Sequence, residues 1–228
     1  MKLLALTKVS AYVLMLPKQI TEGPMADQAI EHMNRERFFA SLKGLPTADL
    51  GAIQTMYWLA KDAHRVQERD GGGRYFEHPR GVASILIELG YRERKYVVPA
   101  LGHDLIEDTF VPLDVIAQLF GSEDYKAMTL LSKKFPVFDP LTGKMLGRYR
   151  KPDDEYYRDI AEGPRPVQLG KSADSLYNMR SLEPWEPERR VAYARKIKKR
   201  VLPIAESADT RIATMLAAEI KQVLDKHA

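Results

Sequence analysis

The chain has 228 residues, of which 45% are hydrophobic and 29% charged, as expected for a globular protein that can bury a core without covalent cross-links. It contains no cysteine, which excludes disulfides, thiolate metal sites and a cysteine nucleophile. The formal net charge of +4 suits an anionic substrate, but it is too small for a nucleic-acid-binding surface, so no nucleic-acid partner is expected.

The chain carries no clear signal for export or membrane insertion. Lys8 interrupts the apolar run within residues 1–20, and no convincing small-residue cleavage site follows that run. An uncharged stretch of about 18 residues, which a membrane span requires, does not occur. We therefore expect a cytoplasmic protein without a membrane partner. The dense basic run Arg195–Arg200 is interpreted as the solvated face of a helix.

Apolar residues recur at three- and four-residue spacing along most of the chain, which predicts an all-α fold. Prolines and glycines divide the expected helices. In chain order these helices span about residues 26–42, 47–67, 79–89, 93–107, 112–121, 122–134, 153–162 and 166–181. Two long amphipathic helices, joined near residues 207–209, are expected within residues 187–226. Residues 71–73 and 135–152 are expected to be loops, the second on the surface.

Three segments, far apart in the sequence, contain the side chains that could bind a metal ion or take part in catalysis. Their imidazoles and carboxylates belong to His78, His103, Asp104, Glu107, Asp108 and Asp174. Nitrogen and oxygen ligands without thiolate favour Mn²⁺, Fe²⁺ or Zn²⁺. Such an ion lowers the pKa of water and clamps a phosphate oxygen, as phosphohydrolysis requires. The residues alone thus indicate a candidate metal site without naming a substrate, and either histidine taken singly could equally be a hydrogen-bonded core residue.

The order and spacing of these segments resemble the RelA/SpoT-type alarmone hydrolases, a branch of the HD-domain superfamily that includes the metazoan SpoT homologue. The resemblance covers about residues 60–182. Residues 63–69 (AHRVQER) are similar to A-H-x-x-Q-x-R, and His78-Pro79 follows nine residues after Arg69. Residues 102–109 (GHDLIEDT) are similar to L-H-D-x-x-E-D-T, and residues 171–182 (KSADSLYNMRSL) to K-x-A-D-R-x-x-N-x-R-x-L.

The resemblance implies a helical bundle with one metal ion, usually Mn²⁺, held by His78, His103, Asp104 and Asp174. It implies that Glu107 and Asp108 position or deprotonate the attacking water and handle leaving-group protons. The substrate-binding residues would be Arg69, Tyr75, Lys171 and Asn178. The implied reaction is hydrolysis of the 3′-pyrophosphate of guanosine tetra- or pentaphosphate to GDP or GTP. His64 is expected to support the site or the core rather than to bind metal.

The chain departs from the family pattern at four places. Ser175 stands where the family has arginine, Gly102 where it has a bulky apolar residue, and Gly73-Arg74 where it has Glu-Pro. Residues 135–152 have no recognised counterpart. Arg74 could replace a lost positive charge, or this loop could be shaped for another ligand.

Two other functions therefore stay open. One is an HD phosphohydrolase acting on another nucleotide, such as the 2′-phosphate of NADPH or a nucleoside 5′-phosphate. The other is a non-catalytic nucleotide-binding or interaction module. We expect residues 1–45 to form an N-terminal extension and residues 46–228 to form the HD-type domain, without a synthetase domain. The sequence leaves a homo-oligomer open.

Overall fold

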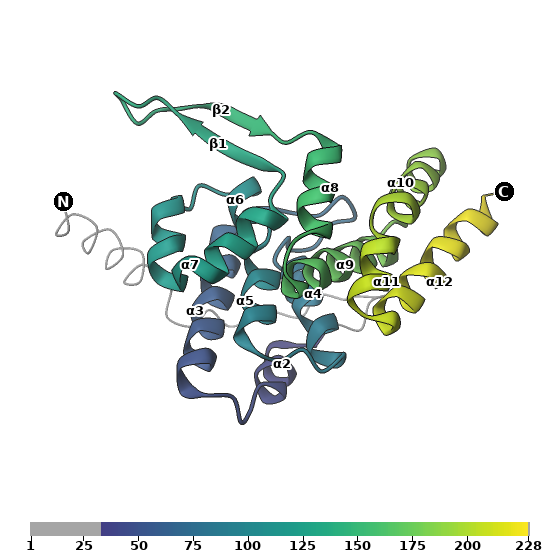
Figure 1. Ribbon diagram of the computed structural model, residues 1–228, viewed down its shortest axis with the longest axis horizontal. Helices are drawn as coiled ribbons and strands as arrows, with labels where there is room; N and C mark the ends of the chain where they lie inside the picture. Colours follow the sequence, from purple (N-terminus) through teal and green to yellow (C-terminus); the bar gives the residue numbers. More distant parts are fainter. Residues whose placement is uncertain (1–32, 228) are drawn as a thin grey trace.

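The computed structural model describes residues 33–227, which form a bundle of helices with one two-stranded hairpin (Figure 1). The all-α prediction is confirmed. The elements are α2 (Arg35–Ser41), α3 (Thr47–Ala63), α4 (Glu77–Glu88), α5 (Arg94–Gly102), α6 (Leu105–Asp108), α7 (Leu113–Leu131), β1 (Lys134–Phe138), β2 (Met145–Arg150), α8 (Asp153–Ala161), α9 (Arg165–Arg180), α10 (Pro187–Arg200), α11 (Leu202–Ala208) and α12 (Thr210–Lys226). The expected helical residues 26–32 lie outside the described part.

The core lies where α4, α5 and α9 pack together at the centre of the bundle (Figure 1). Helix α3 covers α5 on one side, and α11 and α12 cover α9 on the other. Phe38 of α2 and Leu42, just after it, are fully buried in the same core as Tyr57. Each such side chain contributes about 1.5–3 kcal/mol by its removal from water. No helix within residues 33–227 is both long and apolar enough to cross a membrane.

Local signals explain several helix boundaries. Gly121, with φ 77°, separates the two halves of α7, where two helices were predicted. Asp209 ends α11 and caps α12, since its carboxylate accepts the Arg211 N–H at 2.7 Å, and this junction was also predicted. The sequence missed a further break before Pro203, which lies in the first turn of α11 and cannot continue the hydrogen bonding of α10.

Two other predicted helices were too long. Helix α3 ends at Ala63, because the next residues turn back so that the Tyr75 N–H donates to Gln67 O at 3.0 Å. The predicted helix 93–107 is broken at His103 and Asp104, which separate α5 from α6. This break lies inside the predicted metal site.

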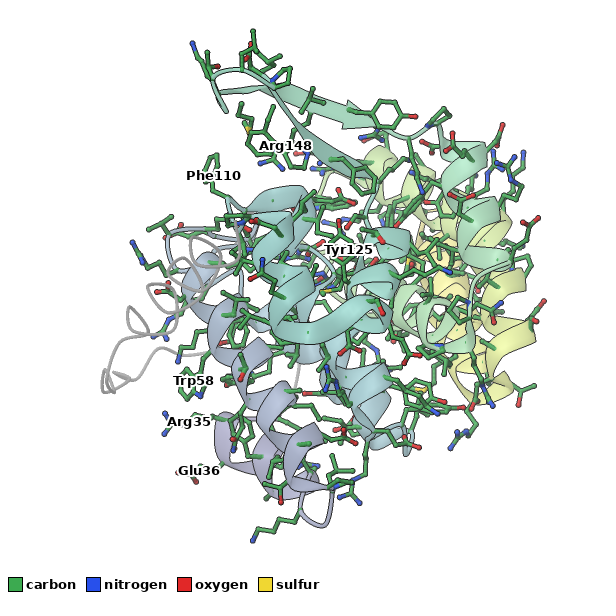
Figure 2. All side chains as sticks on the ribbon, turned by 60° about the vertical axis from the view of Figure 1, so that its left-hand side comes forward. Arg35, Glu36, Trp58, Phe110, Tyr125 and Arg148 are labelled. Carbon is green, nitrogen blue, oxygen red and sulfur yellow. The ribbon has the colours of Figure 1, made fainter. Side chains whose placement is uncertain are left out.

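The predicted surface loop 135–152 is mostly a hairpin that projects beyond the helices (Figure 1). Strands β1 and β2 pair antiparallel, with Lys134 opposite Arg150. The turn is closed by Asp139, whose carboxylate accepts the N–H groups of Leu141 and Thr142. Arg148, which pairs with Pro136 in the middle of the ladder, lies above Phe110 at the edge of the helices (Figure 2). At the base of the hairpin the Lys133 N–H donates to Glu107 Oε1, so the hairpin starts directly beside α6.

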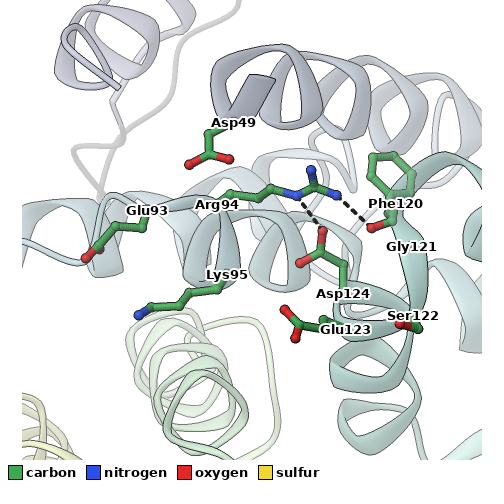
Figure 3. A pocket seen from close by; sticks show the side chains of 9 residues that line it. All are labelled: Asp49, Glu93, Arg94, Lys95, Phe120, Gly121, Ser122, Glu123 and Asp124. Atoms are coloured by element: carbon green, nitrogen blue, oxygen red, sulfur yellow. Dashed lines mark hydrogen bonds and ion pairs between the residues drawn. The ribbon is translucent and has the colours of Figure 1, made fainter. Parts of the chain in front are cut away.

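An ion pair fixes α5 against α7. Arg94 Nε donates to Asp124 Oδ2 at 2.8 Å, and Arg94 Nη2 donates to Phe120 O at 2.6 Å (Figure 3). Asp124 is 5% exposed. The pair borders a cavity of about 420 Å³. The other charged residues that line it are acidic except for Lys95, namely Asp49, Glu93 and Glu123. Because its arginine is already paired and most of its other charges are negative, this cavity is poorly suited to binding an anion.

Replacing Arg94 by methionine is expected to lower the free energy of unfolding by about 1–3 kcal/mol, because Asp124 would keep a buried charge without its main donor. Urea denaturation measures the change. The matched control is Lys95→Met at the next, exposed position, which is expected to change stability by less than about 0.5 kcal/mol. Equal losses in the free energy of unfolding of both variants would show that the pair of Arg94 and Asp124 does not stabilise the fold.

Candidate functional site

The four predicted metal ligands converge from three parts of the bundle. His78 lies in the first turn of α4, His103 and Asp104 lie between α5 and α6, and Asp174 lies within α9. The two imidazole Nε2 atoms are 3.1 Å apart. Asp174 Oδ1 is 3.3 Å from His78 Nε2, and Asp104 Oδ2 is 3.1 Å from His103 Nε2. The structure thus brings together all four side chains that the motifs singled out.

This donor set fits a divalent metal ion. Ligand atoms of His78, His103 and Asp174 all lie within 4.8 Å of one another, and Asp104 Oδ2 adds an oxygen beside both imidazoles. His103 Nδ1 lies 2.8 Å from Ala100 O, so Nδ1 donates its proton there, and Nε2 is the nitrogen at which a metal ion would replace a proton. Two imidazole nitrogens with carboxylate oxygens suit a borderline or hard cation.

His103 and Asp104 share one site although they are adjacent in the chain. On a continuous helix, neighbouring side chains leave about 100° apart. Both residues lie at the break between α5 and α6 with backbone angles in the right-handed helical region, so their side chains converge only close to the chain. There His103 Nε2 lies 3.1 Å from Asp104 Oδ2.

Charged neighbours keep the buried carboxylates ionised. Burial opposes the charge on Asp174, but Lys171 Nζ at 2.7 Å and the nearby imidazoles hold the pKa of Asp174 well below its usual range. Burial likewise opposes charge on Lys171, yet Asp174 raises the pKa of Lys171 well above its usual value. Burial also opposes protonation of His103, but Asp104 raises the pKa of His103 to about 9. The cluster attracts positive charge.

Glu107 and Asp108 occupy different positions. Glu107 lines the same cavity as the four ligands, and its Oε1 accepts the backbone N–H of Lys133. Burial raises the pKa of Glu107. Asp108 lies to one side, where Oδ2 is 3.2 Å from the Tyr75 hydroxyl, and it is not among the lining residues of this cavity. Glu107 is therefore the better placed of the two to hold a proton beside the metal ligands.

Tyr75 and Lys171, both predicted to bind substrate, contact the ligand carboxylates directly. The Tyr75 hydroxyl is 2.8 Å from Asp104 Oδ2, and Lys171 reaches Asp174. The His64 ring stacks on the Tyr75 ring, with the two centroids 4.7 Å apart. These contacts place Tyr75 and Lys171 beside the carboxylates of the candidate metal ligands, where they can orient them.

Arg69 and Asn178 connect the ligands to a second cavity. Asn178 Nδ2 donates to Asp174 Oδ1 at 2.7 Å, and Arg69 Nη2 donates to Asn178 Oδ1 at 2.8 Å. The cavity with the metal ligands has a volume of about 260 Å³. The adjoining cavity, of about 460 Å³, shares Arg69 and Asn178 and is also lined by Trp185 and by the glycine loop 71–73. Together the two cavities offer room for a phosphate group and a nucleoside.

The structure also adds cavity residues that the sequence did not reveal. They come from the hairpin, α8 and α10, and include Lys133, Lys134, Arg150, Tyr156, Tyr157, Tyr193 and Lys196. The only sequence signal among them was the basic run Arg195–Arg200. Lys196 of this run is 40% exposed, in line with a solvated face, but it also lines the cavity.

The departures from the family pattern have local explanations in two places. A Cβ on Gly102 would lie 2.4 Å from Met128 Sδ and 2.9 Å from Met56 Cε, so the two methionines fill the space of a larger residue. Ser175 is fully buried. Arg74 is exposed and lines the larger cavity.

Comparison with known proteins agrees with the motifs. Residues 57–128 match the family model described as HD domain. The chain is 32% identical over 157 residues to the guanosine-3′,5′-bis(diphosphate) 3′-pyrophosphohydrolase of Aquifex aeolicus (strain VF5), covering 67% of this chain and 21% of that protein. It is 32% identical over 162 residues to the bifunctional (p)ppGpp synthase/hydrolase SpoT of Escherichia coli (strain K12), covering 71% and 22%. The chain spans about a fifth of the length of these curated relatives.

A solved structure shares the fold. It was reported as a metazoan ortholog of SpoT that hydrolyzes ppGpp, and it superposes with a TM-score of 0.62 at 23% identity. The match covers 78% of this chain and 97% of that one. The chain therefore contains an HD domain and resembles the RelA/SpoT-type alarmone hydrolases, as its motifs predicted.

Proposed function

We propose that the chain is a metal-dependent phosphohydrolase that removes the 3′-pyrophosphate from guanosine tetra- or pentaphosphate and leaves GDP or GTP. The observation that carries this proposal is the convergence of two imidazoles and two carboxylates in a cavity with a cationic rim. The adjoining aromatic cavity suits a nucleoside. The names of the curated relatives describe the same reaction.

His78, His103, Asp104 and Asp174 would hold the ion, Mn²⁺ in this proposal. When bound, such an ion supplies Lewis acidity at a phosphoryl oxygen and lowers the pKa of water. Lys171 and Tyr75 hold the carboxylates of Asp174 and Asp104 in place.

Glu107 would take the proton of the attacking water. Burial raises its pKa, which makes its carboxylate a stronger base, and the Lys133 N–H fixes one of its two oxygens. The proton that Glu107 takes from water would return to the leaving group, relayed by the neighbouring Asp108, which lies beside the cavity with the metal ligands. Arg69 would offset phosphate charge, and Asn178 would orient the nucleotide through its hydrogen bonds.

Product analysis tests this function. Incubation of guanosine tetraphosphate with the Mn²⁺-loaded chain is expected to release GDP and pyrophosphate, and the Asp104→Ala variant is expected to release neither. Parallel incubations with NADPH and a nucleoside 5′-monophosphate detect the alternative hydrolases through orthophosphate release. An untouched guanosine tetraphosphate in the parent reaction would refute the proposal.

A further inference from the structure

The cavity with the metal ligands has more positive charge on its rim than one phosphate group needs. Besides Arg69 and Lys171, which contact Asn178 and Asp174, it is lined by four cations from other elements, namely Lys133, Lys134, Arg150 and Lys196. None of these four belongs to the motifs that led to the metal site. Their arrangement is therefore separate evidence about the ligand.

Three of these cations gather around a single carboxylate. Lys133 Nζ pairs with Asp153 Oδ1, Lys196 Nζ lies 3.4 Å from Asp153 Oδ2, and Arg150 Nη2 lies 3.9 Å from Asp153 Oδ1. The single negative charge of Asp153 is thus shared by three positive side chains. We call Lys133, Arg150 and Lys196 the Asp153 cluster.

The fold forces these cations together. Lys133 directly precedes β1, Arg150 ends β2, and the Lys151 N–H donates to Lys133 O at 2.9 Å across the base of the hairpin. Lys196 comes from α10, a separate part of the chain. The Lys133 ammonium is held over the Tyr156 and Tyr157 rings, at 5.3 and 5.7 Å from their centroids, and its side chain is 9% exposed. A buried cation at this place is fixed before any ligand arrives.

The exposure of the other two members leaves them accessible. The side chains of Arg150 and Lys196 are 57% and 40% exposed. An entering anion can therefore approach both from the cavity while Lys133 stays in position. Cations that repel one another across a shared carboxylate gain from a second anion, and the fork of arginine suits phosphate oxygens.

We propose that the Asp153 cluster binds a second phosphate group of the substrate, apart from the group that faces the metal ligands. This inference rests on the proposed function, because it assigns the cluster to the same cavity. It names the substrate class as nucleotides with at least two phosphate groups in reach of one another. It disfavours a nucleoside 5′-monophosphate, which would leave the cluster without an anion.

The test is calorimetric titration of the Mn²⁺-loaded full chain with inorganic pyrophosphate and, separately, with inorganic phosphate. The test variant carries Arg150→Gln and Lys196→Gln. The matched control carries Lys198→Gln and Lys199→Gln, which removes the same charge from exposed positions of α10 that do not line the cavity. Thermal unfolding checks that both variants keep the fold.

Pyrophosphate is expected to bind the test variant about tenfold more weakly than the parent, since a hydrogen bond to a charged group contributes about that factor. Inorganic phosphate has one phosphate group, which the metal ion and its neighbours can bind without the Asp153 cluster. It is therefore expected to bind parent and variant with affinities equal within about twofold. The control is expected to match the parent for both ligands.

Three outcomes would overturn the inference: no loss of pyrophosphate affinity in the test variant, an equal loss in the control, or an equal loss for inorganic phosphate. No loss in the test variant would mean that the cluster does not bind phosphate. An equal loss in the control would mean that only the net charge of the protein matters. An equal loss for inorganic phosphate would mean that the cluster binds the same phosphate group that faces the metal ligands. These readouts need no turnover. If guanosine tetraphosphate stayed intact while the pyrophosphate contrast held, the proposed reaction would fail and the second phosphate subsite would stand.

Discussion

The Asp174→Asn variant is expected to lose both hydrolysis and stability. Asp174 and Lys171 are 10% and 15% exposed, with 2.7 Å between Oδ2 and Nζ, so the change leaves a nearly buried ammonium without its counter-ion. Breaking such a pair costs about 3–5 kcal/mol in the free energy of unfolding. Loss of a metal ligand is expected to slow hydrolysis by about 10³-fold, which corresponds to about 4 kcal/mol of transition-state stabilisation. Urea denaturation of metal-free protein and steady-state kinetics measure the two losses.

Adding Lys171→Met to Asp174→Asn separates these effects. The double variant has no unpaired buried charge, so its stability is expected to return to within about 1 kcal/mol of the parent. Its hydrolysis is expected to stay as low as that of the single variant, because the negatively charged carboxylate ligand is still missing. Recovered hydrolysis in the double variant would mean that Asp174 is not a metal ligand.

The Gly81→Ala variant is expected to lower the free energy of unfolding by about 2 kcal/mol, although alanine favours helices by nearly 1 kcal/mol over glycine. A Cβ on Gly81 would lie 2.0 and 2.6 Å from two ring atoms of Tyr177, where α4 contacts α9. This ring packs edge-on against His78, with centroids 4.9 Å apart. Displacing it is also expected to weaken Mn²⁺ binding, which calorimetric titration measures alongside urea denaturation.

Gly102→Ala is the matched control, because it also adds one methyl group to a buried helical glycine. Its nearest neighbours are the flexible ends of Met128 and Met56, which can move aside. The expected loss is below about 1 kcal/mol. If both variants were equally stable, the rigid ring of Tyr177 would not set the spacing of α4 and α9.

Local chemistry explains what the sequence could predict. Gly121 and Asp209 mark helix boundaries because a positive φ and an N-cap are properties of a few neighbouring residues. The proposed metal ligands could be named because their motifs were recognised. By contrast, Gly102 ends α5 directly before His103, but it also packs closely against Met128 and Met56, so the sequence alone did not show whether it ends a helix or only lets helices approach.

The hairpin and its cations depend on contacts between distant residues. Strand β1 is short and contains Pro136, so its pattern alone does not predict a strand. It is held at its base by the Lys133 N–H bonded to Glu107, 26 residues away. Lys133 and Lys196 meet only because α8 and α10 pack beside this base. The spacing of residues in the sequence does not predict such contacts.

The projecting hairpin also has a consequence for self-association. In a two-stranded sheet each strand has one open edge, and such an edge can recruit a strand from another molecule. Phe138 and Leu146 are 50% and 64% exposed and would favour that pairing. Pro136 has no amide hydrogen to offer an incoming strand, and the ladder is irregular between Val137 and Phe138. These two features make the edge of β1 a poor template for a strand from another molecule, whereas β2 contains no proline.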